Sequence, residues 1–429
     1  MVSLFSVMSP DEMQKHTRKQ RRFDDVEAEL PNYAKASKAS SPTLPAISYP
    51  ILGSKNPLPR SVAADDTVWL LDNTAYKNPE SGNWEAEFVS AVFAQHPSCT
   101  VLDAVSSVGK GIGLSDDDPS YPTIEERIMP FIQDIHPGTK VQALQAGTNS
   151  LKLGPGGRNG ISSDVKPVQK SNDNPLVAPT FAQVPNGANG VLEMKTFFAE
   201  PEGWSVISGK LANRNASPPK SPRLTANALD IDDTIKVTMT SDPIGILKST
   251  FTDTPQPCPG MPELYKYIVS LIKETSPFFY LSASPYNLYP FLRDFRQKYY
   301  PHGTIILRDS SWMSIPGLLS SITLGTEQYK VGRMDRIREW LPKRKFICIG
   351  DSTQADPESY GKIYRKYPGW VKLILIRKVT DIAALGIESK NEPKRFNRAF
   401  KGVPRERWHV FEDAAECRAI IQKMVAEES

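Results

Sequence analysis

Over the second half of the chain, short apolar runs alternate with segments of helical periodicity. The apolar runs have the length and the Ile, Leu and Phe content of buried strands, and they are Phe278–Ser282, Thr304–Arg308, Lys345–Asp351 and Lys372–Arg377. The helical segments are Met261–Lys273, Tyr286–Tyr299, Tyr329–Leu341 and Glu358–Lys366. Strands that alternate with helices form βαβ units, whose parallel sheet is covered by helices on both faces. The pattern therefore predicts an α/β, Rossmann-like domain over residues 230–429.

The first half of the chain has a different pattern of polar and apolar residues. Residues 1–45 carry a basic cluster, His16–Arg22, and a stretch rich in Ser, Ala and Pro, which together predict a disordered basic tail. Residues 46–208 contain β-branched and aromatic segments typical of strands, at Thr67–Asp72, Trp84–Phe93, Lys140–Leu144, Ser150–Leu153, Gly190–Phe198 and Trp204–Ile207. The segment Thr123–Ile135 has helical spacing, and Ser171–Gln183 has the composition of an irregular loop. We expect a smaller β-rich domain with one helix ahead of the α/β domain.

The segment Asp230–Thr234 carries the clearest chemistry. It reads D-x-D-x-T, with two carboxylates two residues apart and a hydroxyl two residues further on. In an extended segment, Asp230 and Asp232 point to the same side. One carboxylate can then attack a phosphorus atom, forming an aspartyl-phosphate, while the other protonates the leaving oxygen. An acidic loop with Thr234 as a turn cap is the alternative, so the motif alone does not establish an active site.

The predicted topology selects further residues. In parallel α/β sheets, ligands bind beyond the carboxyl ends of the strands. Ser282 and Ser284 follow one predicted strand, and Asp351 and Asp356 follow another. Lys330 lies near the start of a predicted helix and has the charge needed to join them. We expect these side chains to gather at one edge of the sheet.

The chemistry of this set fits a phosphomonoesterase. A phosphate monoester brings about two negative charges, so its site needs a divalent cation, a cationic side chain and hydrogen-bond donors. Mg²⁺ prefers one or two carboxylates together with phosphate oxygens and waters. Asp230 and Asp351 can supply those carboxylates, with the main-chain carbonyl of Asp232 as a third ligand, and Lys330 can neutralise the intermediate. The phosphate oxygens would be bound by hydroxyl groups, those of Thr234, Ser282 and Ser284.

Four segments resemble fungal phosphatidate phosphatases of the actin-patch type, within the haloacid-dehalogenase-like superfamily; they are Asp230–Val237, Tyr280–Leu292, Gly303–Arg308 and Phe346–Gln354. The resemblance implies Mg²⁺-dependent conversion of phosphatidate to diacylglycerol. It implies a cytoplasmic protein, peripheral to membranes, with endocytic or cortical actin-patch proteins as partners. It makes Asp230 the nucleophile, Asp232 the acid/base and Lys330 the motif lysine. The metal-binding positions that it implies are Asp230, Asp232, Asp351 and Asp356.

One segment departs from the family pattern. In the family, the strand that ends Val206-Ile-Ser208 runs directly into the D-x-D-x-T aspartate, whereas here residues 209–229 stand between them. This segment is polar and carries several prolines, and its position within a strand indicates a retained intron. A genuine surface insertion is the alternative. In that case either Asn227–Asp230 replaces Val206–Ser208 in the sheet, or the nucleophile is displaced.

Composition narrows the class of protein. The 429 residues carry a net charge of only +4, which argues against a general nucleic-acid binder. The four cysteines are scattered and the five histidines do not cluster, which predicts a reducing compartment without a disulfide framework or a zinc site. No apolar run is long enough for a membrane span.

Two other functions remain open. The D-x-D-x-T motif does not determine the substrate, so a phosphatase of soluble monoesters or phosphoproteins would carry the same motif. A catalytically disabled interaction protein is the other alternative, because residues 209–229 interrupt the site. For a lipid phosphatase, Tyr286, Tyr289 and Trp312 are expected to contact the membrane interface. Four basic residues are expected to attract anionic lipid, namely Lys236, Lys248, Arg293 and Arg308.

Overall fold

The computed structural model describes residues 63, 66–94, 101–133, 136, 139–145, 149–155, 161–183, 192–209, 234, 236, 243–272, 275–308, 326–380 and 387–428. The predicted tail at residues 1–45 lies outside this part of the chain, as do residues 210–229. Asp230, Asp232 and Trp312 also lie outside the described residues.

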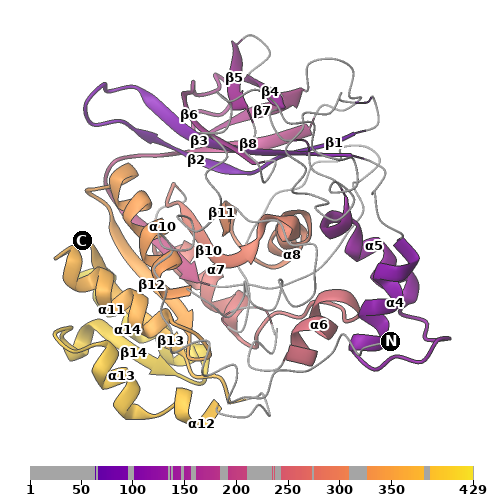
Figure 1. The fold of residues 1–429 in the computed structure, drawn as a ribbon. Coiled ribbons are helices and arrows are strands. Elements are labelled where there is room, and N and C mark those ends of the chain that lie inside the picture. The colour runs from indigo at the N-terminus through magenta and orange to yellow at the C-terminus, as the bar shows by residue number, and fades with distance from the viewer. Residues whose placement is uncertain are drawn as a thin grey trace, which may run out of the picture.

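A six-stranded sheet forms the centre of the C-terminal half (Figure 1), in the order β11-β10-β9-β12-β13-β14. Each pair of neighbouring strands is parallel. The strands are β9 (Trp204–Gly209), β10 (Phe278–Pro285), β11 (Gly303–Arg308), β12 (Lys345–Asp351), β13 (Val371–Arg377) and β14 (Trp408–Phe411). The predicted parallel sheet is confirmed. Its central strand, β9, comes from the sequence that precedes Asp230.

The inner strands are buried on both faces, which explains their uninterrupted apolar sequences. In β12, Ile347 and Ile349 pack into one core cluster, whereas Phe346 and Cys348 pack into the other. The same alternation continues in β13, where Leu373 and Leu375 face the first cluster and Ile374 and Ile376 face the second. Side chains alternate between the faces of a strand, so a sheet covered on both sides needs apolar residues at every position.

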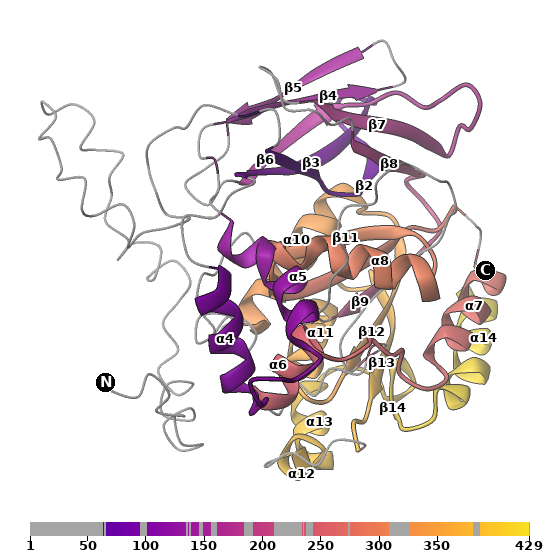
Figure 2. The ribbon, with the colours of Figure 1, turned by 90° about the vertical axis from the view of Figure 1, so that its right-hand side faces the viewer.

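Helices cover both faces of this sheet (Figures 1 and 2). The first face packs against α6 (Pro243–Phe251), α7 (Met261–Leu271), α8 (Tyr289–Tyr299) and α14 (Cys417–Glu428). The second face packs against α10 (Thr326–Trp340), α11 (Asp356–Lys366) and α13 (Pro393–Ala399), and α12 (Ile387–Lys390) precedes α13 in the chain. Helix α10 buries Val331, Met334 and Ile337, at the three-residue spacing that places side chains on one face of a helix.

The N-terminal half forms an eight-stranded sheet in the order β1-β3-β2-β8-β7-β4-β5, with β6 beside β3. The strands are β1 (Thr67–Leu70), β2 (Asn73–Lys77), β3 (Trp84–Phe93), β4 (Lys140–Gln145), β5 (Asn149–Pro155), β6 (Ile161–Pro167), β7 (Val177–Gln183) and β8 (Leu192–Ala199). Only β2 and β8 pair in parallel among these described strands. The expected β-rich region is therefore present.

This half differs from the prediction in its strands and in its helices. Strands β2 and β6 were not predicted. The expected loop Ser171–Gln183 contains β7, which pairs with β4 and β8 although it carries Pro179. The predicted helix is α5 (Tyr121–Ile132), but a second helix, α4 (Val101–Gly111), packs against it. The β-branched, Ser and Gly residues of α4 have weak helix propensity, so its buried Val105 and Val108 rather than local preference hold it.

The two sheets meet at a buried polar junction, with the eight-stranded sheet lying across one end of the α/β layers (Figures 1 and 2). Asp72, just before β2, accepts a hydrogen bond from Arg296 of α8 at 2.6 Å, and its N–H donates to the Tyr289 hydroxyl at 2.7 Å. The hydroxyls of Thr74 and Thr304 lie 2.5 Å apart. These contacts tie β2 to α8 and β11.

Candidate active site

The carboxyl ends of β9, β10 and β12 place the predicted residues together. Leu281 of β10 pairs with Gly209, and Ile349 of β12 pairs with Ser208. Ser282 and Asp351 therefore both lie one residue beyond the level of Gly209, on opposite sides of β9. The structure gathers them at the edge of the sheet where α/β proteins bind ligands.

Asp351 ends β12 and is almost completely buried. Its Oδ1 accepts hydrogen bonds from the N–H of Thr353, at 2.5 Å, and from the Thr353 hydroxyl. Its Oδ2 is buried and accepts no hydrogen bond from the described residues. A buried carboxylate oxygen without a donor is costly unless a cation or another donor reaches it. Asp351 thus presents one fixed oxygen and one oxygen available for a ligand.

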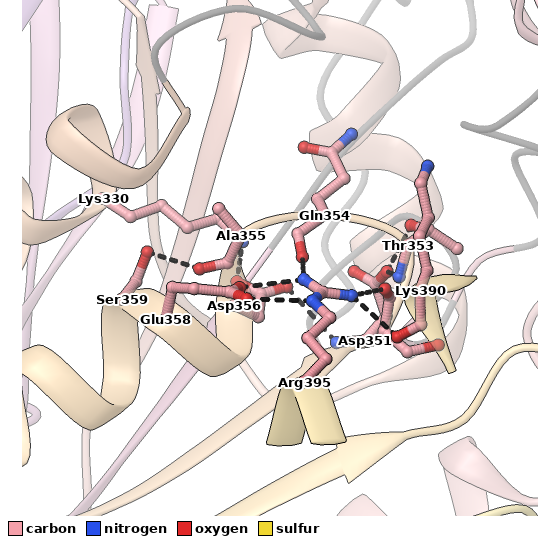
Figure 3. A network of polar contacts seen from close by, with 11 residues as sticks. Lys330, Asp351, Thr353, Gln354, Ala355, Asp356, Glu358, Ser359, Lys390 and Arg395 are labelled. Carbon is pink, nitrogen blue, oxygen red and sulfur yellow. Dashed lines mark hydrogen bonds and ion pairs between the residues drawn. The ribbon is translucent and has the colours of Figure 1, made fainter. Parts of the chain in front are cut away.

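Lys330 and Asp356 form a buried ion pair beside Asp351 (Figure 3). Lys330 comes from α10 and Asp356 begins α11, and neither side chain is exposed. The second carboxylate oxygen of Asp356 accepts the N–H of Asp351 at 3.2 Å. Asp356 therefore links the lysine to the end of β12.

Ser282 and Ser284 lie in β10 and are both buried. The Ser282 hydroxyl oxygen accepts the N–H of Ser284 at 2.9 Å, and the Ser284 hydroxyl has no hydrogen-bond partner among the described residues. Thr234 is also buried. The structure places both serines at the predicted edge.

The carboxylates of the D-x-D-x-T motif, Asp230 and Asp232, are outside the described residues, so their predicted roles remain predictions. Within the described part of the chain, no group of three or more His, Cys, Asp or Glu side chains is placed to hold a metal ion. Asp351 and Asp356 are the described members of the four predicted metal-binding positions. Of these two, only Asp351 keeps a carboxylate oxygen that is not already accepting a hydrogen bond.

Sequence reasoning missed two residues around this site. Thr353 donates twice to Asp351, and Arg395 contacts the main chain on both sides of Thr353 (Figure 3). The hydroxyl two residues after Asp351 could have suggested the first contact, because short polar side chains cap nearby carboxylates and main-chain groups. Arg395 lies 43 positions from Ser352 and carries no local signal.

The structure decides one alternative for the 209–229 segment. Val206, Ile207 and Ser208 pair with both β10 and β12, so Asn227–Asp230 does not replace them in the sheet. The first alternative for a genuine insertion is therefore wrong. The position of Asp230 after this segment lies outside the described residues.

The expected membrane-facing tyrosines are core residues. Tyr286 and Tyr289 are 1% and 2% exposed, and Lys236 is fully buried. Tyr286 packs edge-on against Trp69 of β1, and the Tyr289 hydroxyl receives the Asp72 N–H. The prediction that Tyr286 and Tyr289 meet lipid is wrong, because the N-terminal sheet covers the start of α8. Among the basic residues, the prediction for Lys236 is wrong because its side chain is buried, whereas those for Lys248, Arg293 and Arg308 stay predictions. Among the helices of the described ranges, none is long and apolar enough to cross a membrane.

A cavity of about 900 Å³ lies on the other side of the molecule, beside Phe278 and Gly303 at the amino ends of β10 and β11. The lysine and the carboxylates described above lie near the carboxyl ends of the strands. This cavity is therefore separate from the candidate active site.

Comparison with known proteins finds a family that resembles the part of the chain that contains these residues. Residues 228–378 match the family described as phosphatidate phosphatase APP1, catalytic domain. The matched description names a phosphatidate phosphatase and its catalytic domain. The chain is also similar to phosphatidate phosphatase APP1 of Saccharomyces cerevisiae, with 30% identity over 170 residues. The resemblance drawn from the sequence motifs is confirmed.

The similarity covers part of each protein. It includes 38% of this chain and 28% of the yeast protein. The APP1 catalytic-domain match contains Ser282, Lys330, Asp351 and Asp356. Strand β9, at the centre of the sheet, precedes the match, and Arg395 follows it.

Proposed function

We propose that this chain is a Mg²⁺-dependent phosphatidate phosphatase that releases inorganic phosphate and leaves diacylglycerol. The proposal rests chiefly on one observation. Inside the APP1 catalytic-domain match, a buried lysine–aspartate pair adjoins Asp351, whose free buried oxygen faces no donor from the described residues. A polyanionic substrate needs this combination of fixed positive charge and cation-binding oxygen.

We also assign the C-terminal half to the haloacid-dehalogenase-like superfamily. The parallel sheet with β9 at its centre, and with β10 and β12 on either side, supports this assignment. The central strand leads toward the D-x-D-x-T motif, and the neighbouring strands carry Ser282 and Asp351. Ser282 and Asp351 thus come from the ends of separate strands, as in other sheets of this kind.

The residues present fit a divalent cation. Asp351 Oδ2 is a buried carboxylate oxygen that accepts no hydrogen bond within the part of the chain that the structure describes, and hard cations such as Mg²⁺ prefer oxygen ligands. Asp230 and the carbonyl of Asp232 would complete the protein ligands. When bound, the cation would neutralise charge on the phosphate oxygens and orient them.

We propose a role for Asp356 that differs from the expected one. Both of its carboxylate oxygens already accept protein hydrogen bonds, one from Lys330 and one from the Asp351 N–H. We therefore propose that Asp356 orients Lys330 and the end of β12, and that Asp351 alone of this pair binds the cation.

The chain's own groups would carry the reaction in two steps. Asp230 attacks phosphorus, and the bond between phosphorus and the glycerol oxygen breaks. Asp232 gives its proton to that oxygen, which leaves with diacylglycerol. Asp232 then takes a proton from water as the water oxygen attacks the aspartyl-phosphate, which restores Asp230 and releases phosphate. Lys330 and Ser282 would hold the phosphate oxygens throughout.

Phosphate release tests this function directly. Purified chain would be incubated with phosphatidate in mixed micelles and with p-nitrophenyl phosphate, each with Mg²⁺ and with EDTA. We expect Mg²⁺-dependent release from phosphatidate that exceeds release from the soluble ester. Greater release from the soluble ester would favour a phosphatase of soluble monoesters, and no release from either would favour the disabled interaction protein. The expected cytoplasmic location and the actin-patch partners stay predictions from the resemblance.

A further inference from the structure

Arg395 joins three parts of the chain around the end of β12. It lies on α13, beyond the segment that matches the APP1 catalytic domain, and its side chain is 14% exposed. Its Nε and one terminal nitrogen donate to both carboxylate oxygens of Glu358, at 2.9 and 2.8 Å. A paired contact of this kind fixes the plane of the guanidinium group.

The rest of the guanidinium group holds the loop after Asp351 (Figure 3). One terminal nitrogen donates to the carbonyl of Gln354, and the other donates to the carbonyls of Ser352 and Lys390. Thr353 lies between the two loop carbonyls that Arg395 binds. Arg395 therefore fixes the main chain on both sides of the residue that donates twice to Asp351.

This arrangement determines which oxygen of Asp351 remains available. With Thr353 held in place, its N–H and hydroxyl both point to Asp351 Oδ1. The carboxylate group cannot rotate without losing these two hydrogen bonds, so Oδ2 keeps its position. Arg395 thus acts on Asp351 Oδ2 through one intermediate residue, Thr353.

We propose that Arg395 is a positioning residue for Asp351, and that it sets the affinity of the site for a divalent cation. The proposal rests on the proposed function, in which Asp351 binds Mg²⁺. Residues that orient metal ligands typically contribute about 10- to 100-fold in metal affinity. A lysine cannot replace Arg395 fully, because one ammonium group cannot reach Glu358 and the separated carbonyls as a planar five-donor group does.

Mg²⁺ binding without substrate tests this role, measured by titration calorimetry on the full chain. The variants are Arg395→Met, Arg395→Lys and Asp351→Asn, with Arg398→Met as the matched control on the exposed side of the same helix. We expect Arg395→Met to weaken Mg²⁺ binding about 10- to 100-fold, Arg395→Lys to weaken it less, and Arg398→Met to leave it unchanged. Circular dichroism establishes that each variant is folded, and Arg395→Lys is the decisive variant if the methionine variant does not fold.

The outcomes separate this inference from the proposed function. If Asp351→Asn abolishes Mg²⁺ binding while folded Arg395 variants bind like the wild type, the positioning role is wrong and the proposed function stands. If Asp351→Asn binds Mg²⁺ like the wild type, the assignment of Asp351 as a cation ligand is wrong, and the role of Arg395 fails with it.

Discussion

At Gly350, the main chain of β12 packs closely against Asp356. A Cβ atom there would lie 2.7 Å from the Cβ and Cγ of Asp356 and 2.8 Å from a ring carbon of Tyr360. These distances are too short for real side chains, so one of the packed groups would have to move. The pair of Lys330 and Asp356 depends on the absence of a side chain at this glycine.

We predict that Gly350→Ala lowers phosphatase activity at least tenfold and destabilises the fold by about 1–3 kcal/mol. Gly332→Ala, on α10 with nothing near the added carbon, is the control. It should leave activity unchanged and raise stability by up to about 1 kcal/mol. Kinetics and urea denaturation of both variants provide the measurement, and full activity in Gly350→Ala would contradict the close packing.

Single residues differ in how far the sequence predicts their surroundings. Lys330, Asp351 and Asp356 could be placed because they follow strands or begin helices, and topology fixes where strand ends meet. The burial of Tyr289 could not be predicted in this way, since its hydroxyl accepts a hydrogen bond from the N–H of Asp72, which lies 217 positions away in the chain. Contacts between distant segments leave no periodic pattern for local reasoning to detect.

At the scale of elements, the apolar runs of the parallel sheet were the most predictable features. Strand β12 was predicted with its observed bounds because both of its faces are buried. Strand β7 was missed because Pro179 and flanking polar residues resemble a loop, whereas its pairing with β4 and β8 stabilises it. Pro179 pairs with Lys195 of β8 but lies just before the residues that pair with β4, so at this position β7 has a partner strand on one side only, which is where a sheet tolerates proline.

The intact β9 sharpens the prediction for residues 209–229. Deleting them joins Ser208 to Asp230, which then occupies the register position of Gly209, next to Leu281. Asp230 would lie one residue before the level of both Ser282 and Asp351. We expect the deletion to raise the melting temperature and the phosphatase activity. A shortened chain that melts earlier than the full chain would show that the segment is genuine structure.

At the level of the complete chain, we expect the junction between the two sheets to lose stability at low pH. His302 stacks on Phe197 with ring centroids 3.8 Å apart, and its Nε2 lies 3.5 Å from Asp72. Burial and the nearby Arg296 lower the pKa of His302 from 6.5 to about 4. Burial alone would raise the pKa of Asp72, but Arg296 and His302 outweigh burial and hold it below 3.8.

The unfolded chain binds a proton at His302 near pH 6.5, whereas the folded chain binds it only at about pH 4. The free energy of unfolding should therefore decrease as the pH falls from about 6.5 to about 4. The loss attributable to His302 is at most about 3 kcal/mol, at about 1.4 kcal/mol per pKa unit. Urea denaturation at pH 7 and pH 4.5 would measure it. His302→Gln should flatten the pH dependence. Equal slopes in the wild type and His302→Gln would contradict this account.

The proposed reaction depends on Asp230 as the nucleophile that attacks the phosphate of phosphatidate. The most direct measurement compares Mg²⁺-dependent phosphate release from phosphatidate by the wild-type chain, Asp230→Asn and Asp233→Asn, with folding of each variant established by circular dichroism. Asp233 is the matched control, since it lies in the same acidic segment but outside the D-x-D positions. We expect Asp230→Asn to lose turnover, to below about 1% of wild type, because an amide does not replace the attacking carboxylate. Asp233→Asn should retain most activity, and substantial turnover by folded Asp230→Asn would mean that Asp230 is not the nucleophile.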